Sequence, residues 1–141
     1  MDFSTTFKMI GSAFTAQRAK MDTIVSNLAN IHTTRTQEGG PYRRKFVVFA
    51  PEPVEGDRDS RLRGVLNGVK VQAIMGDQTP FKQVFDPAHP DANATGFLSV
   101  PNVNLITEMA DMINANRAYE ACVTAFDASK NMALKTLDIG R

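Results

Sequence analysis

The sequence has one cysteine, no tryptophan and almost no excess of either charge. Cys122 is alone, so it cannot form an internal disulfide. The 16 Lys and Arg residues nearly balance the 15 Asp and Glu residues, which leaves a formal net charge of +1. We therefore expect no nucleic-acid partner. No apolar run approaches the roughly 20 residues that a membrane helix needs, so we also expect no membrane insertion.

Motifs of secretion and catalysis are missing as well. The N-terminus lacks a basic segment followed by an apolar run, so we expect no cleaved signal peptide. There is no glycine-rich phosphate loop, no nucleophile elbow and no pair of zinc-binding histidines. We expect no catalytic residue, no cofactor, no metal site and no small-molecule substrate.

Two short polar segments are the best candidates for chemistry. Asp86, His89 and Asp91 have the residue types of a metal or acid–base site, but prolines lie among them. Aspartates in such a segment usually bond nearby backbone amides, so we interpret residues 86–91 as a turn. We interpret the basic segment 43–45 as a solvated strand edge that discourages wrong pairing, rather than as a phosphate contact.

Proline is missing from both ends of the chain. All seven prolines lie between residues 41 and 101. Because proline breaks helix interiors, the chain divides into an N-terminal helix (1–32), a strand and turn insert (33–101) and a C-terminal helix (102–141). The predicted fold class is mainly α with a β-rich insert. An elongated pair of terminal coiled-coil helices would flank a small region of strands and loops.

Local patterns refine this division. Strands are predicted at 46–49, 68–75, 81–85 and 97–98, where β-branched and aromatic residues gather. A turn is predicted at 38–41, and a solvated loop at 55–63. Asn104 is the predicted N-cap of the second helix, with Glu108 in its first turns where the helix dipole favours a carboxylate.

Both helical segments repeat apolar residues at alternating spacings of three and four, which is the pattern of a coiled coil. The first stripe consists of Phe7, Ile10, Phe14, Gln17, Met21, Ile24 and Leu28, and the second of Met109, Met112, Asn116, Tyr119, Val123 and Phe126. We expect the two stripes to pack on each other. Their polar members, Gln17 and Asn116, either fix the register or point to the edge and meet water.

The opposite faces of both helices carry small, uncharged side chains. They are Ser12, Ala16 and Ala19 on the first helix and Ala118, Ala121, Ala125 and Ala128 on the second. A helix face that meets water usually carries Lys, Glu or Arg. The stripes alone fit an ordinary bundle core, but uncharged back faces favour a second protein layer. Because the chain is too short to supply that layer, we predict a subunit of an ordered assembly.

The chain resembles a known family at both ends. The segment Ser26-Asn27-Leu28-Ala29-Asn30 is similar to the motif that ends the N-terminal helix of bacterial flagellar axial proteins, which form the rod and hook. Glu108-Met109 and the segment 116–121, which includes Arg117, are similar to the C-terminal helix motif of that family. Segments 38–45, 86–92 and 101–104 resemble its proximal-rod members. Cys122 departs from the family, which usually has asparagine there.

The resemblance implies a flagellar basal-body rod protein. Such proteins are exported unfolded by the flagellar type III export apparatus without a cleaved signal, and self-assemble with other copies into a periplasmic rod. The terminal helices form an inner tube and the insert an outer layer. The rod transmits torque and encloses the export channel. The implied partners are other proximal-rod proteins and the motor-side ring of the basal body.

Three alternatives stay open from the sequence. The first is another small proximal-rod subunit, and the second is a soluble coiled-coil adaptor protein. The third is a small hydrolase or metal protein built around segment 86–91.

Overall fold

The computed structural model describes residues 3–54 and 67–140. The elements follow in the order α1 (Phe3–Ala29), β1 (Lys45–Pro53), β2 (Asn67–Gly76), β3 (Lys82–Phe85), β4 (Phe97–Val100) and α2 (Leu105–Ile139). The predicted fold class is confirmed, because two long terminal helices flank a small antiparallel strand region. The predicted loop at 55–63 lies outside the described residues.

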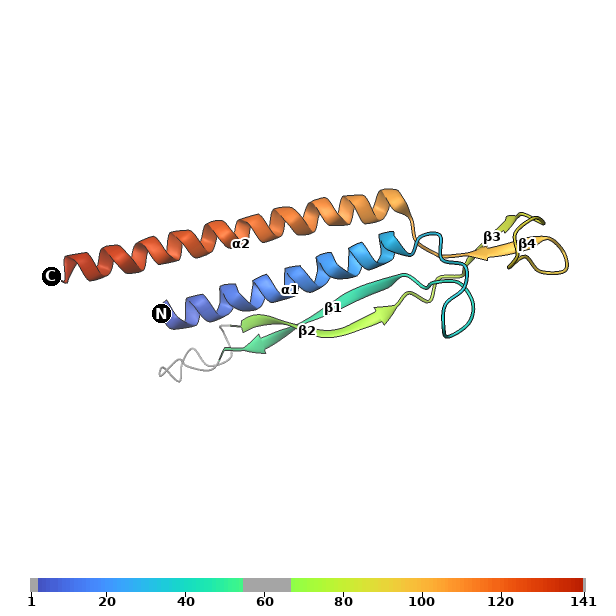
Figure 1. Cartoon of the computed structure of the whole chain (residues 1–141). Coiled ribbons are helices and arrows are strands. Elements are labelled where there is room, and N and C mark those ends of the chain that lie inside the picture. Colours follow the sequence, from blue (N-terminus) through green and yellow to red (C-terminus); the bar gives the residue numbers. More distant parts are fainter. Residues whose placement is uncertain (1–2, 55–66, 141) are drawn as a thin grey trace.

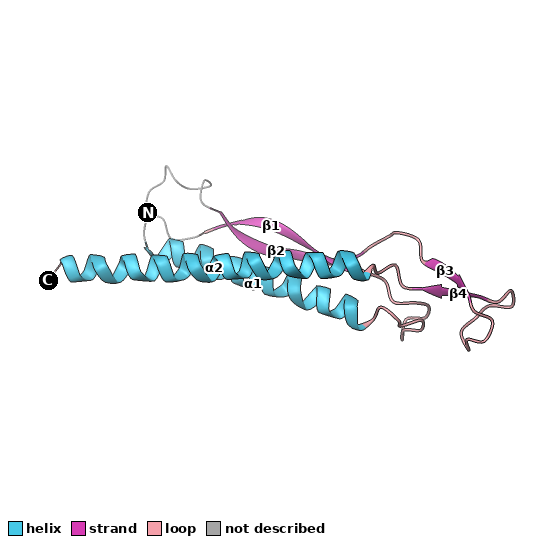
Figure 2. Cartoon of the chain, turned by 90° about the horizontal axis from the view of Figure 1, so that it is seen from above, coloured by secondary structure: helices cyan, strands magenta, loops and turns pink. Residues whose placement is uncertain are grey.

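The two helices run antiparallel along the length of an elongated molecule (Figures 1 and 2). Aromatic rings join them: Phe7 contacts Phe126 with ring centroids 5.3 Å apart, and Phe14 contacts Tyr119 at 5.0 Å. A third ring pair joins Phe14 to Phe126 at 6.4 Å. Tilted and edge-to-face aromatic pairs of this kind add to the free energy of apolar burial. The helix pair is therefore held by large side chains from both predicted stripes.

A β-ribbon covers α1 on the side away from α2. Strands β1 and β2 form a two-stranded antiparallel sheet that lies along α1, so that α1 is the middle of three layers (Figure 1). The Ser12 hydroxyl accepts a hydrogen bond from the Val69 amide at 3.0 Å, and Ala16 is only 1% exposed. For α1, the expectation that only other copies could supply the second layer is wrong. Its small side chains instead allow the chain's own ribbon to approach closely.

The back of α2 is different. Ala121, Ala125 and Ala128 are exposed and Ala118 is half-buried, since the described part of the chain has no layer on that side of α2. This long helix is thus covered on one side only.

The α2 face that contacts α1 is rotated away from the second stripe. Ala115 and Ser129 are buried and Met112 and Tyr119 are half-buried, whereas Met109 is 52% exposed. Val123 and Asn116 are exposed too. The expectation that the whole second stripe faces α1 is therefore wrong. The reason is that Glu108 is fully buried on the contact face. A pattern of large apolar residues does not mark a charged residue as a contact position, so the stripe was placed on a neighbouring face.

The strands confirm the four predicted strand positions and extend most of them. Strand β1 continues past the predicted Phe49 to Pro53, although proline cannot donate to a sheet ladder. The ribbon has only two strands, so an outer edge accepts proline without losing a partner. Strands β3 and β4 form a second hairpin at one end of the molecule (Figure 1). There Phe85 and Phe97 pack edge-to-face with ring centroids 5.3 Å apart.

Two local predictions are also confirmed. Asn104 caps α2, because its side-chain oxygen accepts hydrogen bonds from the amides of Ile106 at 3.0 Å and Thr107 at 3.4 Å. Residues 38–41 form the predicted turn, where Gly39 and Gly40 adopt positive φ angles of 87° and 78°. Glycine has no Cβ and adopts such angles without strain.

The close contact between the ribbon and α1 predicts opposite effects for two glycine substitutions. A Cβ on Gly68 would lie 2.7 Å from the Ser12 hydroxyl oxygen, so Gly68→Ala should displace that hydroxyl and destabilise the monomer by about 1–2 kcal/mol. Nothing lies within 4 Å of a Cβ on Gly11, which is in the interior of α1. Gly11→Ala should stabilise it by about 0.5–1 kcal/mol. Urea unfolding of both variants measures the difference, and equal effects would contradict the close packing.

Candidate functional site

Polar side chains from distant parts of the chain meet where α1 ends and α2 begins. We call this group the polar junction and define it by Asn27, Tyr42, Arg44, Asn102 and Glu108. It joins α1, the segment before β1, the segment before α2 and α2 itself. Asn27 and Glu108 lie in the two terminal motifs, but nothing in the sequence places them together.

Asn27 is the centre of the junction and is only 1% exposed. Its amide nitrogen donates to the Lys45 carbonyl at 2.8 Å and to the Glu108 carboxylate at 3.0 Å. Its carbonyl oxygen accepts from the Lys45 amide at 2.9 Å and from the Tyr42 hydroxyl at 3.1 Å. All four hydrogen-bonding positions of the side chain are used. This one residue therefore ties the end of α1 to the start of β1 and to α2.

Glu108 is fully buried and bears the junction's negative charge. Its second carboxylate oxygen accepts from Arg44 Nε at 2.5 Å, while Arg44 Nη2 lies 3.4 Å from Asp111. Arg44 also reaches Asp77, at 3.7 Å. A buried carboxylate without a partner would be strongly destabilising, so Arg44 is required there. Our interpretation of Arg44 as part of a solvated strand edge is wrong.

Asn102 connects the junction to the second hairpin. Its side-chain oxygen accepts from the Arg44 amide at 2.8 Å, and its nitrogen donates to the Asp77 carbonyl at 3.3 Å and the Thr79 carbonyl at 3.1 Å. Arg43 donates to the same Asp77 carbonyl at 2.7 Å. These contacts hold the segment between β2 and β3, so the second hairpin is fixed relative to the helices.

The Asp77 carboxylate has a lowered pKa. The Thr79 hydroxyl and then the Thr79 amide donate to it, and the guanidinium groups of Arg44 and Arg43 add a smaller attraction. Both effects stabilise the charged form. A lowered pKa in the folded state means that Asp77 favours folding above its usual pKa of 3.8 and loses this contribution as the pH falls.

The other motif residues lie near the junction or outside it. The hydroxyls of Ser26 and Tyr42 are 3.2 Å apart, and the Asn30 side chain donates to the Ser26 carbonyl at 2.9 Å. Ala29 and Arg117 are exposed. Ser26 and Asn30 thus shape the end of α1, whereas Ala29 and Arg117 leave their side chains on the surface.

The stripe residues divide between the helix interface and the surface. In the first stripe, Ile24 is buried and Phe7, Ile10, Phe14, Gln17, Met21 and Leu28 are half-buried. In the second stripe, Phe126 contacts α1 through its ring, although its side chain stays partly exposed. The two polar members do not bond each other. Asn116 is exposed and donates to Glu120 at 3.0 Å, and the Gln17 side-chain oxygen is buried without a hydrogen-bond partner.

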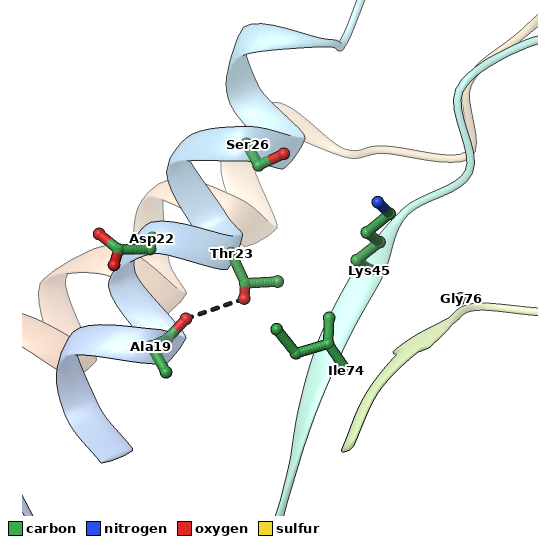
Figure 3. Close-up of a pocket in the computed structure, with 7 residues that line it drawn as sticks. All are labelled: Ala19, Asp22, Thr23, Ser26, Lys45, Ile74 and Gly76. Carbon is green, nitrogen blue, oxygen red and sulfur yellow. Dashed lines mark hydrogen bonds between the residues drawn. The ribbon is translucent and has the colours of Figure 1, made fainter. Parts of the chain in front are cut away.

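Of the back-face residues of α1, Ala19 borders an open groove between α1 and the ribbon (Figure 3). Its volume is about 470 Å³, and it is lined by Ala19, Asp22, Thr23, Ser26, Lys45, Ile74 and Gly76. The Thr23 hydroxyl donates to the Ala19 carbonyl at 2.8 Å. The groove therefore offers methyl groups and one charge of each sign on its walls, without a nucleophile beside a general base.

Segment 86–91 folds as the predicted turn. The Asp86 carboxylate accepts from the Ala88 amide at 3.2 Å, and His89 Nδ1 accepts from the Asp91 amide at 3.1 Å. Across residues 3–54 and 67–140, no three His, Cys, Asp or Glu side chains form a group that could hold a metal ion. No helix in that part of the chain is long and apolar enough to cross a membrane.

Sequence reasoning missed Tyr42, Arg44 and Asn102. They lie within the segments 38–45 and 101–104 that carry the resemblance, which was the only signal available. Nothing in local spacing shows that residues so far apart in the chain share one hydrogen-bond network.

Two protein-family models match the chain. A model described as "Flagella basal body rod protein" matches residues 9–36, and one described as "Flagellar basal body rod FlgEFG protein C-terminal" matches residues 94–139. Together they include the α1 and α2 sides of the polar junction.

Curated proteins match nearly the whole chain. One from Borreliella burgdorferi, named flagellar basal-body rod protein FlgC, is 40% identical over 99% of this chain and 98% of its own length. Proteins of the same name from Bacillus subtilis and Salmonella typhimurium are 45% and 36% identical, covering 92% and 96% of this chain and 93% and 96% of their own lengths.

The buried charge of the polar junction predicts the cost of breaking it. Arg44→Met leaves Glu108 without its cation, and we expect a loss of about 3 kcal/mol in the free energy of unfolding. Arg18→Met is the control, because the pair between Arg18 and Asp22 is exposed and should contribute no more than about 0.5 kcal/mol. Denaturant unfolding measures both.

A third variant tests the reason for this cost. In Arg44→Met/Glu108→Gln the buried charge is gone, so the double variant should be more stable than Arg44→Met alone. A double variant that is no more stable would mean that Arg44 acts through packing rather than charge.

Proposed function

The chain belongs to the flagellar basal-body rod protein family and is a structural subunit of that rod; from this premise we propose that it polymerises helically in the proximal rod. The assembly would be the drive shaft that transmits torque to the hook and encloses the export channel. The three relatives described above share the name FlgC, which supports assignment to that member rather than to another small proximal-rod subunit.

One observation carries the proposal of polymerisation. Helix α2 has 35 residues, yet the described part of the chain covers only one of its sides. The uncovered side includes Ala121, Ala125 and Ala128, which are small enough for another helix to approach closely. A soluble adaptor protein would be expected to carry charged residues on such a face. We propose that neighbouring subunits cover this side of α2.

The proposed arrangement follows the three layers of the subunit. Residues 1–32 and 102–141 would form the inner tube, and residues 33–101 the outer part. The ribbon already covers α1, so in this arrangement α2 makes the main inner-tube contacts. The polar junction would then hold the outer hairpins in a fixed position relative to the tube, which a shaft under torque requires.

The subunit's route and partners belong to the same proposal. Export through the flagellar type III apparatus without a cleaved signal would bring it to a periplasmic rod. There it would contact other copies, other proximal-rod proteins and the motor-side ring. We propose no catalytic activity, since the polar junction uses its charged groups to hold the fold together.

The uncovered face of α2 gives the decisive test. In a monomer, Ala125→Glu and Ala121→Glu place a carboxylate in water, so each should change the free energy of unfolding by no more than about 0.5 kcal/mol. In a packed tube the same carboxylate would meet a neighbouring helix, at a cost of several kcal/mol. We expect the variants to be exported but to build no rod, so that the cells lack hooks and filaments.

Ala125→Ser is the matched control, because it adds a small polar group without charge and should still assemble. Basal bodies purified from variant and parent cells provide the measurement. Intact rods with a normal amount of either Glu variant would refute the burial of this face.

A further inference from the structure

One asparagine lies in a turn that the proposed function does not use. Asn93 is followed by Ala94 and Thr95, and no other asparagine in the sequence begins the pattern Asn-X-Ser/Thr, in which X is any residue except proline. This pattern is the acceptor for N-linked glycosylation, and it belongs to surface loops of proteins that leave the cytoplasm. Because three residues can match by chance, the structure around Asn93 decides what the match means.

Asn93 lies on the surface, in the turn that joins β3 to β4. Residues 93–95 are all exposed. Figures 1 and 2 show this hairpin at the end of the molecule opposite the C-terminus of α2. A bulky group attached to Asn93 would therefore lie far from the uncovered face of α2 that the proposed function needs.

The side-chain amide of Asn93 is oriented with its nitrogen free. Its oxygen accepts hydrogen bonds from the Thr95 amide at 3.0 Å, the Thr95 hydroxyl at 2.7 Å and the Phe97 amide at 2.9 Å. Backbone amides only donate, so the oxygen must be the atom that faces them. The Asn93 nitrogen has no hydrogen-bond partner in residues 3–54 and 67–140, in contrast to the fully bonded Asn27. It is the atom of this side chain that is left to react.

A hollow of about 330 Å³ lies between this turn and the segment that follows α1. Its walls include Arg35, Asp91, Asn93 and Phe97. Phe97 is 42% exposed, and the Asp91 carboxylate accepts a hydrogen bond from the Thr34 hydroxyl at 2.8 Å. An aromatic ring can pack against the C–H groups of a sugar, while carboxylate and guanidinium groups can bond its hydroxyls. The first sugar on Asn93 would thus have a place to pack.

We propose that Asn93 is an N-glycosylation site. The proposal rests on the proposed function, because the transfer takes place outside the cytoplasm and needs an exported chain. A membrane-bound transferase would use an oligosaccharide carried on a lipid pyrophosphate as the donor. The Asn93 nitrogen forms a bond to the anomeric carbon of the first sugar, and the bond from that carbon to the pyrophosphate oxygen breaks. The nitrogen loses one proton, and the lipid pyrophosphate leaves.

Mass spectrometry of basal bodies purified from the cells that make this protein tests the site. Trypsin releases residues 83–117 as one peptide, because no Lys or Arg lies between Lys82 and Arg117. This peptide should be heavier than its sequence by the mass of at least one sugar, and fragmentation should place the addition on Asn93. Thr95→Ser keeps the pattern and should keep the added mass, whereas Thr95→Val removes the hydroxyl and should lose it.

Asn93→Asp is the matched control for folding. Its carboxylate can still accept from the amides of Thr95 and Phe97, so the variant should assemble, but without the nitrogen it should carry no sugar. Rods whose peptide has only the unmodified mass, or an added mass that persists in Asn93→Asp, would refute glycosylation of Asn93 and leave the proposed function intact. Absence of the chain from the rods would refute the proposed function and this inference with it.

Discussion

The pairing of Arg44 with a fully buried Glu108 is the constraint on which the rest of this structure depends. A carboxylate that is 0% exposed fixes which side of α2 turns toward α1. Arg44 must then stand at the start of β1, which sets the position of the ribbon along α1. Asn27 completes the group, because all of its hydrogen-bonding positions are occupied within the junction and at the start of β1. Three elements are thus positioned by one charge that has to be compensated.

The same constraint explains the uneven surface of the subunit. Because Glu108 occupies the contact face, Met109 and Val123 turn outward although the heptad pattern would bury them. The junction is well defined, but apolar groups stay on the surface of the chain. In a monomer these groups remain exposed to water, whereas neighbouring subunits would bury them.

Sequence patterns predicted the elements well and their contacts less well. Proline distribution separated helices from insert, and Asn104 was identified as the cap of α2, because these effects are local. The coverage of α1 by the ribbon was not predictable, since it depends on how Ser12 meets a strand far along the chain. Arg44 was misread for the same reason: a charged residue looks solvated until its buried partner is known.

The separation of contacts along the chain favours one order of folding. Helix α1 and the ribbon lie within the first 76 residues, while Asn27 and Glu108 are 81 positions apart. Closing longer loops costs more conformational entropy, so α1 and the ribbon can associate before α2 arrives. The last helix then completes a partly formed unit. Synthesis or transport that begins at the N-terminus would deliver the segments in this same order. Helix α1 could then pack against the ribbon before α2 emerges.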